Sequence, residues 1–507
     1  MQAPTRGTII TTTTPLRPRR AADRRPVRRA SVLAASTGLG VLLSGFGALS
    51  ASAATPFEPD QLSYPYASNA TYDYVPIIDQ FTTLRAERPD IIALNDEKTV
   101  AINQGATPAR VDRAIVDQYA DMSVSMSDGL GARLGEIYRT ARAAGELPKT
   151  AALLAKDGGL VGYYSSSNPA KEHFDYDRPY IRFPERLTYR DKPGGDAWAS
   201  TSGAYPSGHT SQAYWQGTSL ATMLPELAPQ ILARTSEAGD NRVVMAAHYP
   251  LDVMSGRMMG QEIVERRWAD PEFRVLFEEA SAELRDVLEA GCGASLDVCI
   301  AADTPYLSDQ EALAVYQDRM SYDFPLVGTA GQAMTVPAGA ESLLISSRPT
   351  LTDDQRRQVL ALTAIDSGRP LDKGASGSWQ RLDLAAAMSV PITVAADGTV
   401  SLAAAPVDPA PVDPAPVDPA PVDPGATVPV VPAQPAAGGA VQQPASGTIT
   451  AADAANRAAA ARDAAARADL AYTGSDHVVG IVTAALGLLA AGVGLVVLRR
   501  RRATRQL

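Results

Sequence analysis

The chain has 507 residues, a formal net charge of −10 at pH 7 and 45% hydrophobic residues. Such a length allows several domains, but the composition of both ends is not that of a globular domain. The acidic balance argues against nucleic acid as a partner, so an anionic substrate must be held by a local basic pocket.

The first 53 residues are predicted to be a secretory signal peptide (1–53). They hold eight arginines and one aspartate, an apolar run over 31–49 and the small-residue cleavage pattern Ala51-Ser52-Ala53. The pair Arg28-Arg29 leaves general and twin-arginine export both open. Residues 54–106 are rich in Pro, Tyr and Asp, and we expect a loop-like N-terminal segment with short helices at most.

Residues 107–302 are predicted to form an all-α domain. Apolar residues recur at helical spacing, and caps and prolines mark most helix ends. The first helix begins at Thr107-Pro108, with apolar residues at Val111, Ile115, Tyr119 and Met122. Further helices are expected at 128–144, 149–155, 169–178, 210–224, 228–236, 250–267 and 271–289. No strand-like alternation occurs between 108 and 290.

Two cations stand seven residues apart in the expected helix at 169–178. Asn168-Pro169 suits a helix start and Pro179 ends it, so Lys171 and Arg178 would share one face, two turns apart. In that position both can bind one phosphate. Taken alone, the acids interleaved with them would indicate a solvated helical face. A polar loop at 181–205 follows, which we expect to form a rim over the pocket.

A turn containing Tyr205-Pro206 precedes the helix at 210–224. Either Ser207 or Thr210 can cap that helix, which places backbone N–H groups and the positive end of the helix dipole beside His209. Such a position can bind an anion.

A third stretch holds Arg242, His248 and Asp252. Pro250 fits the first position of a new helix, which places Asp252 in its first turn. From there the carboxylate can reach back to the ring N–H of His248.

Cys292 and Cys299 are the only cysteines. In an exported chain, six intervening residues favour a disulfide that closes a small loop. We expect such a loop to contribute about 2–3 kcal/mol to stability.

Residues 303–402 are predicted to form a small α+β accessory region packed on the helical domain. Helices are expected at 308–320 and 352–364, with Gln355 completing a capping box at the second. Short apolar runs at 333–336, 342–346 and 390–394 are expected to be strands. Arg348 and Arg369 each precede a proline in an expected turn, which favours a surface position.

A disordered, wall-spanning linker is expected at 403–469. Four copies of Ala-Pro-Val-Asp-Pro over 405–424 favour extended polyproline II, which reaches on the order of 60 Å.

Residues 470–507 resemble a sortase sorting signal, in the LAxTG variant of high-GC Gram-positive bacteria. Leu470-Ala471-Tyr472-Thr473-Gly474 precedes 21 uncharged residues at 478–498 and then four arginines. The resemblance implies that sortase cleaves the chain between Thr473 and Gly474 and attaches it to peptidoglycan. Only the transmembrane tail of the precursor would then contact the membrane. The leader has a net charge of +7 (eight Arg, one Asp), and the tail after Thr473 has a net charge of +4 (five Arg, one Asp). Without these two segments, the net charge of the mature chain is −10 − 7 − 4 = −21.

Three spaced motifs carry a second resemblance. The patterns K-x6-R-P at 171–179, P-S-G-H at 206–209 and R-x5-H-x3-D at 242–252 resemble the type 2 phosphatidic acid phosphatase superfamily. Bacterial non-specific acid phosphatases and vanadium-dependent haloperoxidases are among its members. One departure is Asn241, where the family pattern has serine before the arginine.

The resemblance implies a helical bundle with the site at one end, and an acid phosphatase acting through a phosphohistidine. His248 would be the nucleophile, Asp252 would orient it, and His209 would be the general acid and base. The phosphate oxygens would be held by Lys171, Arg178, Arg242, Ser207 and the N–H of Gly208.

The cations around both histidines disfavour metal ligation, so we expect neither a metal nor a cofactor. Vanadate is expected to act as an inhibitor. Two alternatives stay open. The same side chains would serve a vanadium-dependent haloperoxidase, with vanadate as its cofactor, and a wall-anchored binding protein without catalysis would also suit the linker. The chain is expected to be secreted and cell-wall-anchored, and to hydrolyse small phosphomonoesters.

Overall fold

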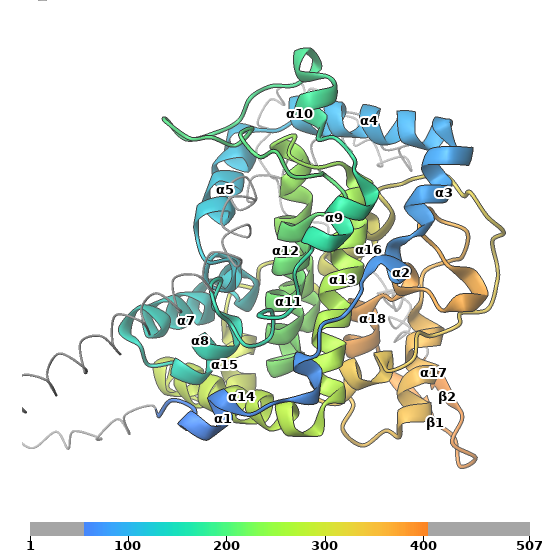
Figure 1. Ribbon diagram of the computed structural model, residues 1–507. Helices are drawn as coiled ribbons and strands as arrows, with labels where there is room; N and C mark the ends of the chain where they lie inside the picture. The colour runs from blue at the N-terminus through green and yellow to red at the C-terminus, as the bar shows by residue number, and fades with distance from the viewer. Residues whose placement is uncertain (1–54, 404–507) are drawn as a thin grey trace, which may run out of the picture. The chain divides into compact units, whose positions relative to one another are not determined.

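The computed structural model describes residues 55–403, which are mainly helical and carry one small sheet (Figure 1). The predicted signal peptide, proline-rich repeats and sorting tail lie outside these residues. Within 55–403, none of the helices combines the length and the apolar character that a membrane span needs.

Three central helices, α11 (Gly208–Met223), α12 (Ala228–Val244) and α13 (Pro250–Ala269), pack against one another (Figure 1). The predictions for α11 and α13 are confirmed to within two residues. The helix predicted at 228–236 is too short, because α12 continues past 236 to Val244 and carries Arg242. Its polar residues gave no apolar pattern, yet they are buried, and Arg234 and Glu237 among them pair with side chains of α5.

Two glycines let α13 lie close to α11. A Cβ added at Gly260 would lie 2.4 Å from the Cβ of Tyr214, and one at Gly256 would lie 2.6 Å from the carbonyl oxygen of Ser207. Larger residues would push apart the helix starts that carry two of the three motifs.

Further helices pack around this centre: α5 (Pro108–Tyr119), α6 (Met122–Ser125), α7 (Ala132–Ala144), α8 (Pro148–Leu154), α14 (Pro271–Cys292) and α15 (Leu296–Ala302). The helix expected at 128–144 is instead a 3-10 turn, η2 (Met126–Leu130), followed by α7. Gly131 separates them with a φ of +104°, which a continuous helix does not permit. The predicted disulfide is confirmed: Cys292 and Cys299 are bonded, with their Cα atoms 6.1 Å apart, and join α14 to α15.

The N-terminal segment is more ordered than predicted. It holds α1 (Pro59–Ser63), α2 (Val75–Ile78), α3 (Gln80–Glu87) and the 16-residue α4 (Pro89–Gln104). The expectation of short helices at most was wrong for α4. Its buried face includes Asn95, Thr99 and Asn103, so the apolar periodicity that marks a helix is interrupted.

Residues 303–403 contribute α16 (Asp309–Ser321), α17 (Asp353–Thr363), α18 (Leu384–Ser389), β1 (Ile392–Val394) and β2 (Val400–Leu402). The capping box of Thr352 and Gln355 forms as expected, and a second one, which was not predicted, forms between Ser308 and Glu311. Only the last expected strand is confirmed, as β1, which pairs antiparallel with β2. Residues 333–336 form no strand, and 340–344 form a 3-10 turn, because no neighbouring strand offers them a ladder. Both α16 and α18 pack on α12.

Arg348 and Arg369 are partly buried instead of lying on the surface as expected. Arg348 donates to the carbonyl oxygens of Ala387 and Val390, and Arg369 donates to that of Phe324. Both arginines therefore tie loops together.

Candidate active site

His248 and Asp252 form a fully buried pair at the start of α13. The Nδ1 of His248 lies 3.1 Å from Oδ2 of Asp252, and both side chains are 0% exposed. The same Oδ2 accepts a hydrogen bond from the backbone N–H of Tyr249 at 3.0 Å. Asp252 thus reaches back from the first helical turn as predicted. This contact favours the tautomer that carries its proton on Nδ1 and leaves the lone pair on Nε2.

Arg178 lies on the other side of the His248 ring. Its Nη1 is 3.2 Å from Nε2 of His248 and donates to the carbonyl oxygen of Ala247 at 3.0 Å. Its Nε and Nη2 donate to the backbone oxygen and Oγ of Ser202, both at 2.9 Å. A guanidinium held by several acceptors has a defined orientation beside the histidine.

Lys171 meets Arg178, but not by the predicted route. The prediction of one helix over 169–178 is wrong beyond residue 174, because α9 (Asn168–Phe174) ends where Asp175 takes a left-handed φ of 41°. Arg178 is then extended and caps α10 (Pro179–Arg182), as a residue before proline prefers. Both cations nevertheless donate to the carbonyl oxygen of Gly203, at 2.6 Å from Lys171 and 3.3 Å from Arg178.

The motif at 206–209 begins α11. Ser207 is the N-cap, and its Oγ accepts from the N–H of Thr210 at 3.2 Å. Its own N–H donates to the carbonyl oxygen of Asp252 at 3.0 Å. This backbone hydrogen bond joins the turn that carries Gly208 and the buried His209 to the first turn of α13.

Arg242, near the end of α12, is held from outside the motifs. Its Nη1 donates to Oε1 of Gln118 on α5 at 2.6 Å, and both side chains are buried. Gln118 was not predicted to lie near the motifs, since a lone glutamine in a helix gives no signal. Asn241, which departs from the family pattern, is fully buried, and within the described residues its amide has no hydrogen-bond partner.

Helix α4 of the N-terminal segment contacts the segments that carry the site, which was not predicted from the sequence. Asn95 of α4 accepts from the N–H of Leu251 at 3.1 Å and so holds the start of α13. Asn103 of the same helix donates to the carbonyl oxygens of Val244 and Thr188. No sequence signal could have found these contacts, because they join segments more than 80 residues apart.

The expected rim at 181–205 starts with the end of α10 and a 3-10 turn, η3 (Pro184–Arg186), and is irregular from 187 onward. Trp198 anchors it, because its Nε1 donates to the carbonyl oxygen of Met245 at 2.9 Å. The ring of Tyr180 stacks on Trp198 with centroids 5.5 Å apart.

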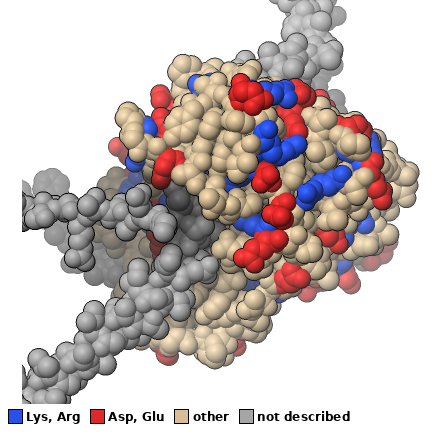
Figure 2. Space-filling model, turned by 45° about the horizontal axis from the view of Figure 1, so that its top comes forward, with Lys and Arg blue, Asp and Glu red and all other residues tan. Residues whose placement is uncertain are grey.

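The cations of the site are buried, whereas the face drawn in Figure 2 mixes acidic and basic side chains. Among residues 55–403, no three His, Cys, Asp or Glu side chains are grouped so that they could hold a metal ion. The site is thus a buried histidine–aspartate pair with Arg178 against the histidine ring, and Lys171 shares a backbone acceptor with Arg178.

The chain is thus a helical protein with a buried histidine–aspartate pair beside an arginine, and comparison with known proteins agrees with this description. Residues 154–264 match the family model of the PAP2 superfamily. The match covers all three motifs, so the predicted resemblance to the type 2 phosphatidic acid phosphatase superfamily is confirmed.

Several curated proteins are similar to the chain. A non-specific acid phosphatase of Salmonella typhimurium is 31% identical over 145 residues, covering 28% of this chain and 55% of that protein. An acid phosphatase of Zymomonas mobilis is 31% identical over 140 residues, or 27% and 51% of the two chains. A non-specific acid phosphatase of Providencia stuartii is 33% identical over 84 residues, or 17% and 34%. The chain thus spans about half the length, or less, of these relatives.

Proposed function

We propose that the protein is a phosphoric monoester hydrolase that acts through a phosphohistidine. The observation that carries this proposal is the alignment of Asp252, His248 and Arg178, in which the two ring nitrogens contact an acid and a cation respectively. The PAP2 superfamily match and the acid phosphatase relatives support it.

In the first step, Nε2 of His248 attacks phosphorus, forming an N–P bond as the ester P–O bond breaks. His209 gives its proton to the departing alkoxide. Asp252 stabilises the imidazolium character that develops on His248. Arg178 turns its Nη1 from the histidine to the phosphate, and Lys171 supports the same oxygens.

In the second step, water attacks the phosphorus and its proton passes to His209, which is now neutral. The N–P bond breaks, and His248 and orthophosphate are released. Arg242, with Ser207 and the N–H of Gly208, holds oxygens in both steps. Since one histidine must be neutral while the other is protonated, the optimum should lie at acidic to neutral pH.

Hydrolysis of p-nitrophenyl phosphate, measured with and without a chelator, tests the activity and the metal-free mechanism together. His248→Ala should abolish turnover, whereas the exposed His173 of α9 supplies a matched control in His173→Ala. Substantial turnover by His248→Ala would end the assignment of the nucleophile.

We propose a broad range of small phosphomonoesters as substrates, because the proposed mechanism assigns the cations to the phosphate oxygens and His209 to the ester oxygen, and assigns no residue to the organic part of the alcohol. Vanadate should compete with substrate, since its trigonal-bipyramidal form resembles the transition state. Inhibition that substrate cannot relieve would contradict a shared site.

We also propose that the protein is secreted and joined by sortase to peptidoglycan. The proposal rests on the sequence patterns at 51–53 and 470–474. Mass spectrometry of wall fragments should find a mature chain that begins near 54 and ends at Thr473. An intact tail in the membrane fraction would refute it.

A further inference from the structure

Helix α5 turns an unusual face toward the protein centre. Its buried residues are Arg110, Ala114, Asp117 and Gln118, whereas Val116 and Tyr119 are 54% and 37% exposed. Apolar periodicity alone would not predict that Arg110, Asp117 and Gln118 are buried while Val116 and Tyr119 are exposed. A helix that buries its polar face needs partners for that face, and α12 supplies them.

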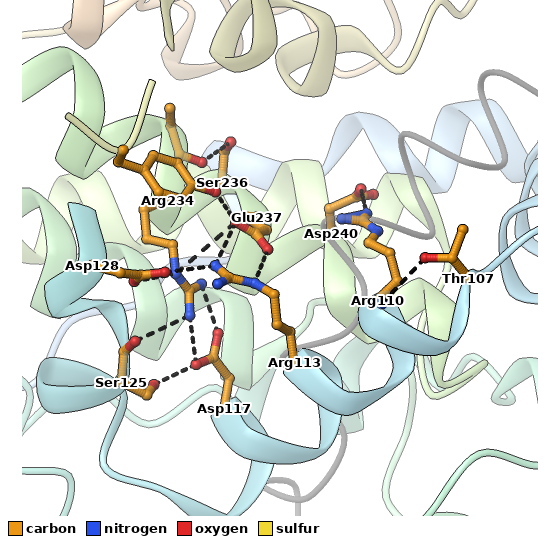
Figure 3. Close-up of polar contacts among 12 residues, drawn as sticks. Thr107, Arg110, Arg113, Asp117, Ser125, Asp128, Arg234, Ser236, Glu237 and Asp240 are labelled. Atoms are coloured by element: carbon orange, nitrogen blue, oxygen red, sulfur yellow. Dashed lines mark hydrogen bonds and ion pairs between the residues drawn. The ribbon is translucent and has the colours of Figure 1, made fainter. Parts of the chain in front are cut away.

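Three ion pairs join α5 to α12 in a regular order. Figure 3 shows these contacts and the neighbouring Asp128. Moving forward along α5 corresponds to moving backward along α12, as in an antiparallel ladder: Arg110–Asp240 at 3.2 Å, Arg113–Glu237 at 2.6 Å and Asp117–Arg234 at 2.8 Å. Burial alone would lower the pKa of Arg234, but the charges of Asp117, Asp128 and Glu237 raise it well above its ordinary value.

The order of charges specifies one register. A slip of one turn in one direction would set Arg113 against Arg234, and the opposite slip would set Asp117 against Glu237. Each slip brings like charges together in a largely buried interface, which is strongly unfavourable. The ladder therefore holds α5 at one position along α12.

That position brings Gln118 to the active site. Gln118 follows Asp117 directly, and its Oε1 accepts from Nη1 of Arg242 at 2.6 Å. We propose that Gln118 is a positioning residue that orients Arg242 for the phosphate, and that the α5–α12 ladder exists to hold it there. This inference rests on the proposed function and concerns a helix outside the segment at 154–264 that matches the family model.

The choice of glutamine has a chemical reason. The neutral amide oxygen accepts one hydrogen from the guanidinium and so orients Arg242 without cancelling its positive charge. A carboxylate at the same place would hold the arginine equally well, but would also neutralise the charge that the phosphate needs.

Two substitutions separate positioning from general stability. Gln118→Ala should raise KM for p-nitrophenyl phosphate and the Kd of inorganic phosphate about tenfold, with a smaller change in kcat. Gln118→Glu should weaken phosphate binding more than Gln118→Ala does at pH 7. Its phosphate affinity should recover toward that of the wild type as the pH falls and the carboxyl gains a proton. Gln230→Ala is the matched control, because Gln230 is also buried and hydrogen-bonded on α12, but to Asp309.

Calorimetric titration with inorganic phosphate and pH profiles of kcat/KM give the result. A phosphate Kd for Gln118→Ala equal to that of Gln230→Ala would overturn the proposal, as would a pH-independent loss in Gln118→Glu. If the wild type binds phosphate but hydrolyses no ester, the proposed function fails while the affinities still test Gln118. If it binds no phosphate, both fail.

Discussion

The stability of this protein should fall as the pH rises, because α13 buries two carboxyl groups near each other. Burial, opposed by a hydrogen bond with Tyr72 and the charge of Arg266, raises the pKa of Glu262 to about 7. Burial also raises the pKa of Glu265 to about 8, and the charges of Glu262 and Glu341 add to it while Arg266 opposes it. The folded state therefore keeps protons that the unfolded chain releases.

The magnitude follows from the shift of Glu265 from 4.5 to about 8. At about 1.4 kcal/mol per pH unit, this shift is worth at most about 5 kcal/mol. The stability is present in full below pH 4.5 and is lost progressively as the pH rises through the folded pKa. With an unfolding entropy of about 2.1 cal/mol/K per residue over roughly 350 residues, the loss corresponds to a fall in Tm of about 7 °C.

Glu265→Gln removes the titrating group and keeps the side chain's shape. Calorimetric melts at pH 5, 7 and 9 should show a variant close to wild type at pH 5 and more stable by up to about 7 °C at pH 9. Glu278→Gln, at an exposed position on α14, is the control and should follow the wild type throughout. If the Tm of Glu265→Gln changes with pH just as the wild-type Tm does, or if the wild-type Tm rises with pH, Glu265 does not destabilise the protein at high pH.

Three further predictions concern the site and its supports. Asp252→Asn should lower kcat about 100-fold or more with little change in KM, because it disturbs the tautomer of His248 and leaves the cations in place; unchanged kcat would contradict that role. Replacing Cys292 and Cys299 by alanine should lower the free energy of unfolding in denaturant by about 2–3 kcal/mol, and no loss would show that the loop is held by other contacts. Asn95→Ala should cost about 1–3 kcal/mol in the same assay by leaving the N–H of Leu251 without its acceptor, and no loss would show that this contact does not hold the start of α13.

Helix starts were predictable because their signals are local. The caps Thr107, Ser308 and Thr352 each accept a hydrogen bond from the backbone N–H three residues later, and Pro250 begins α13 as expected. The reach of Asp252 back to His248 depends only on the geometry of one helical turn.

The sequence by itself located the three motifs of the PAP2 superfamily match, since each motif is contiguous and its spacing can be read directly. The tertiary structure alone decided how Lys171 and Arg178 meet, because a single left-handed residue at 175 replaced the expected helix. It also decided that α5 buries its charged face, since burial depends on what the opposing helix offers. Gln118 reaches Arg242 across 124 positions of the chain, and no local pattern records a contact of that range.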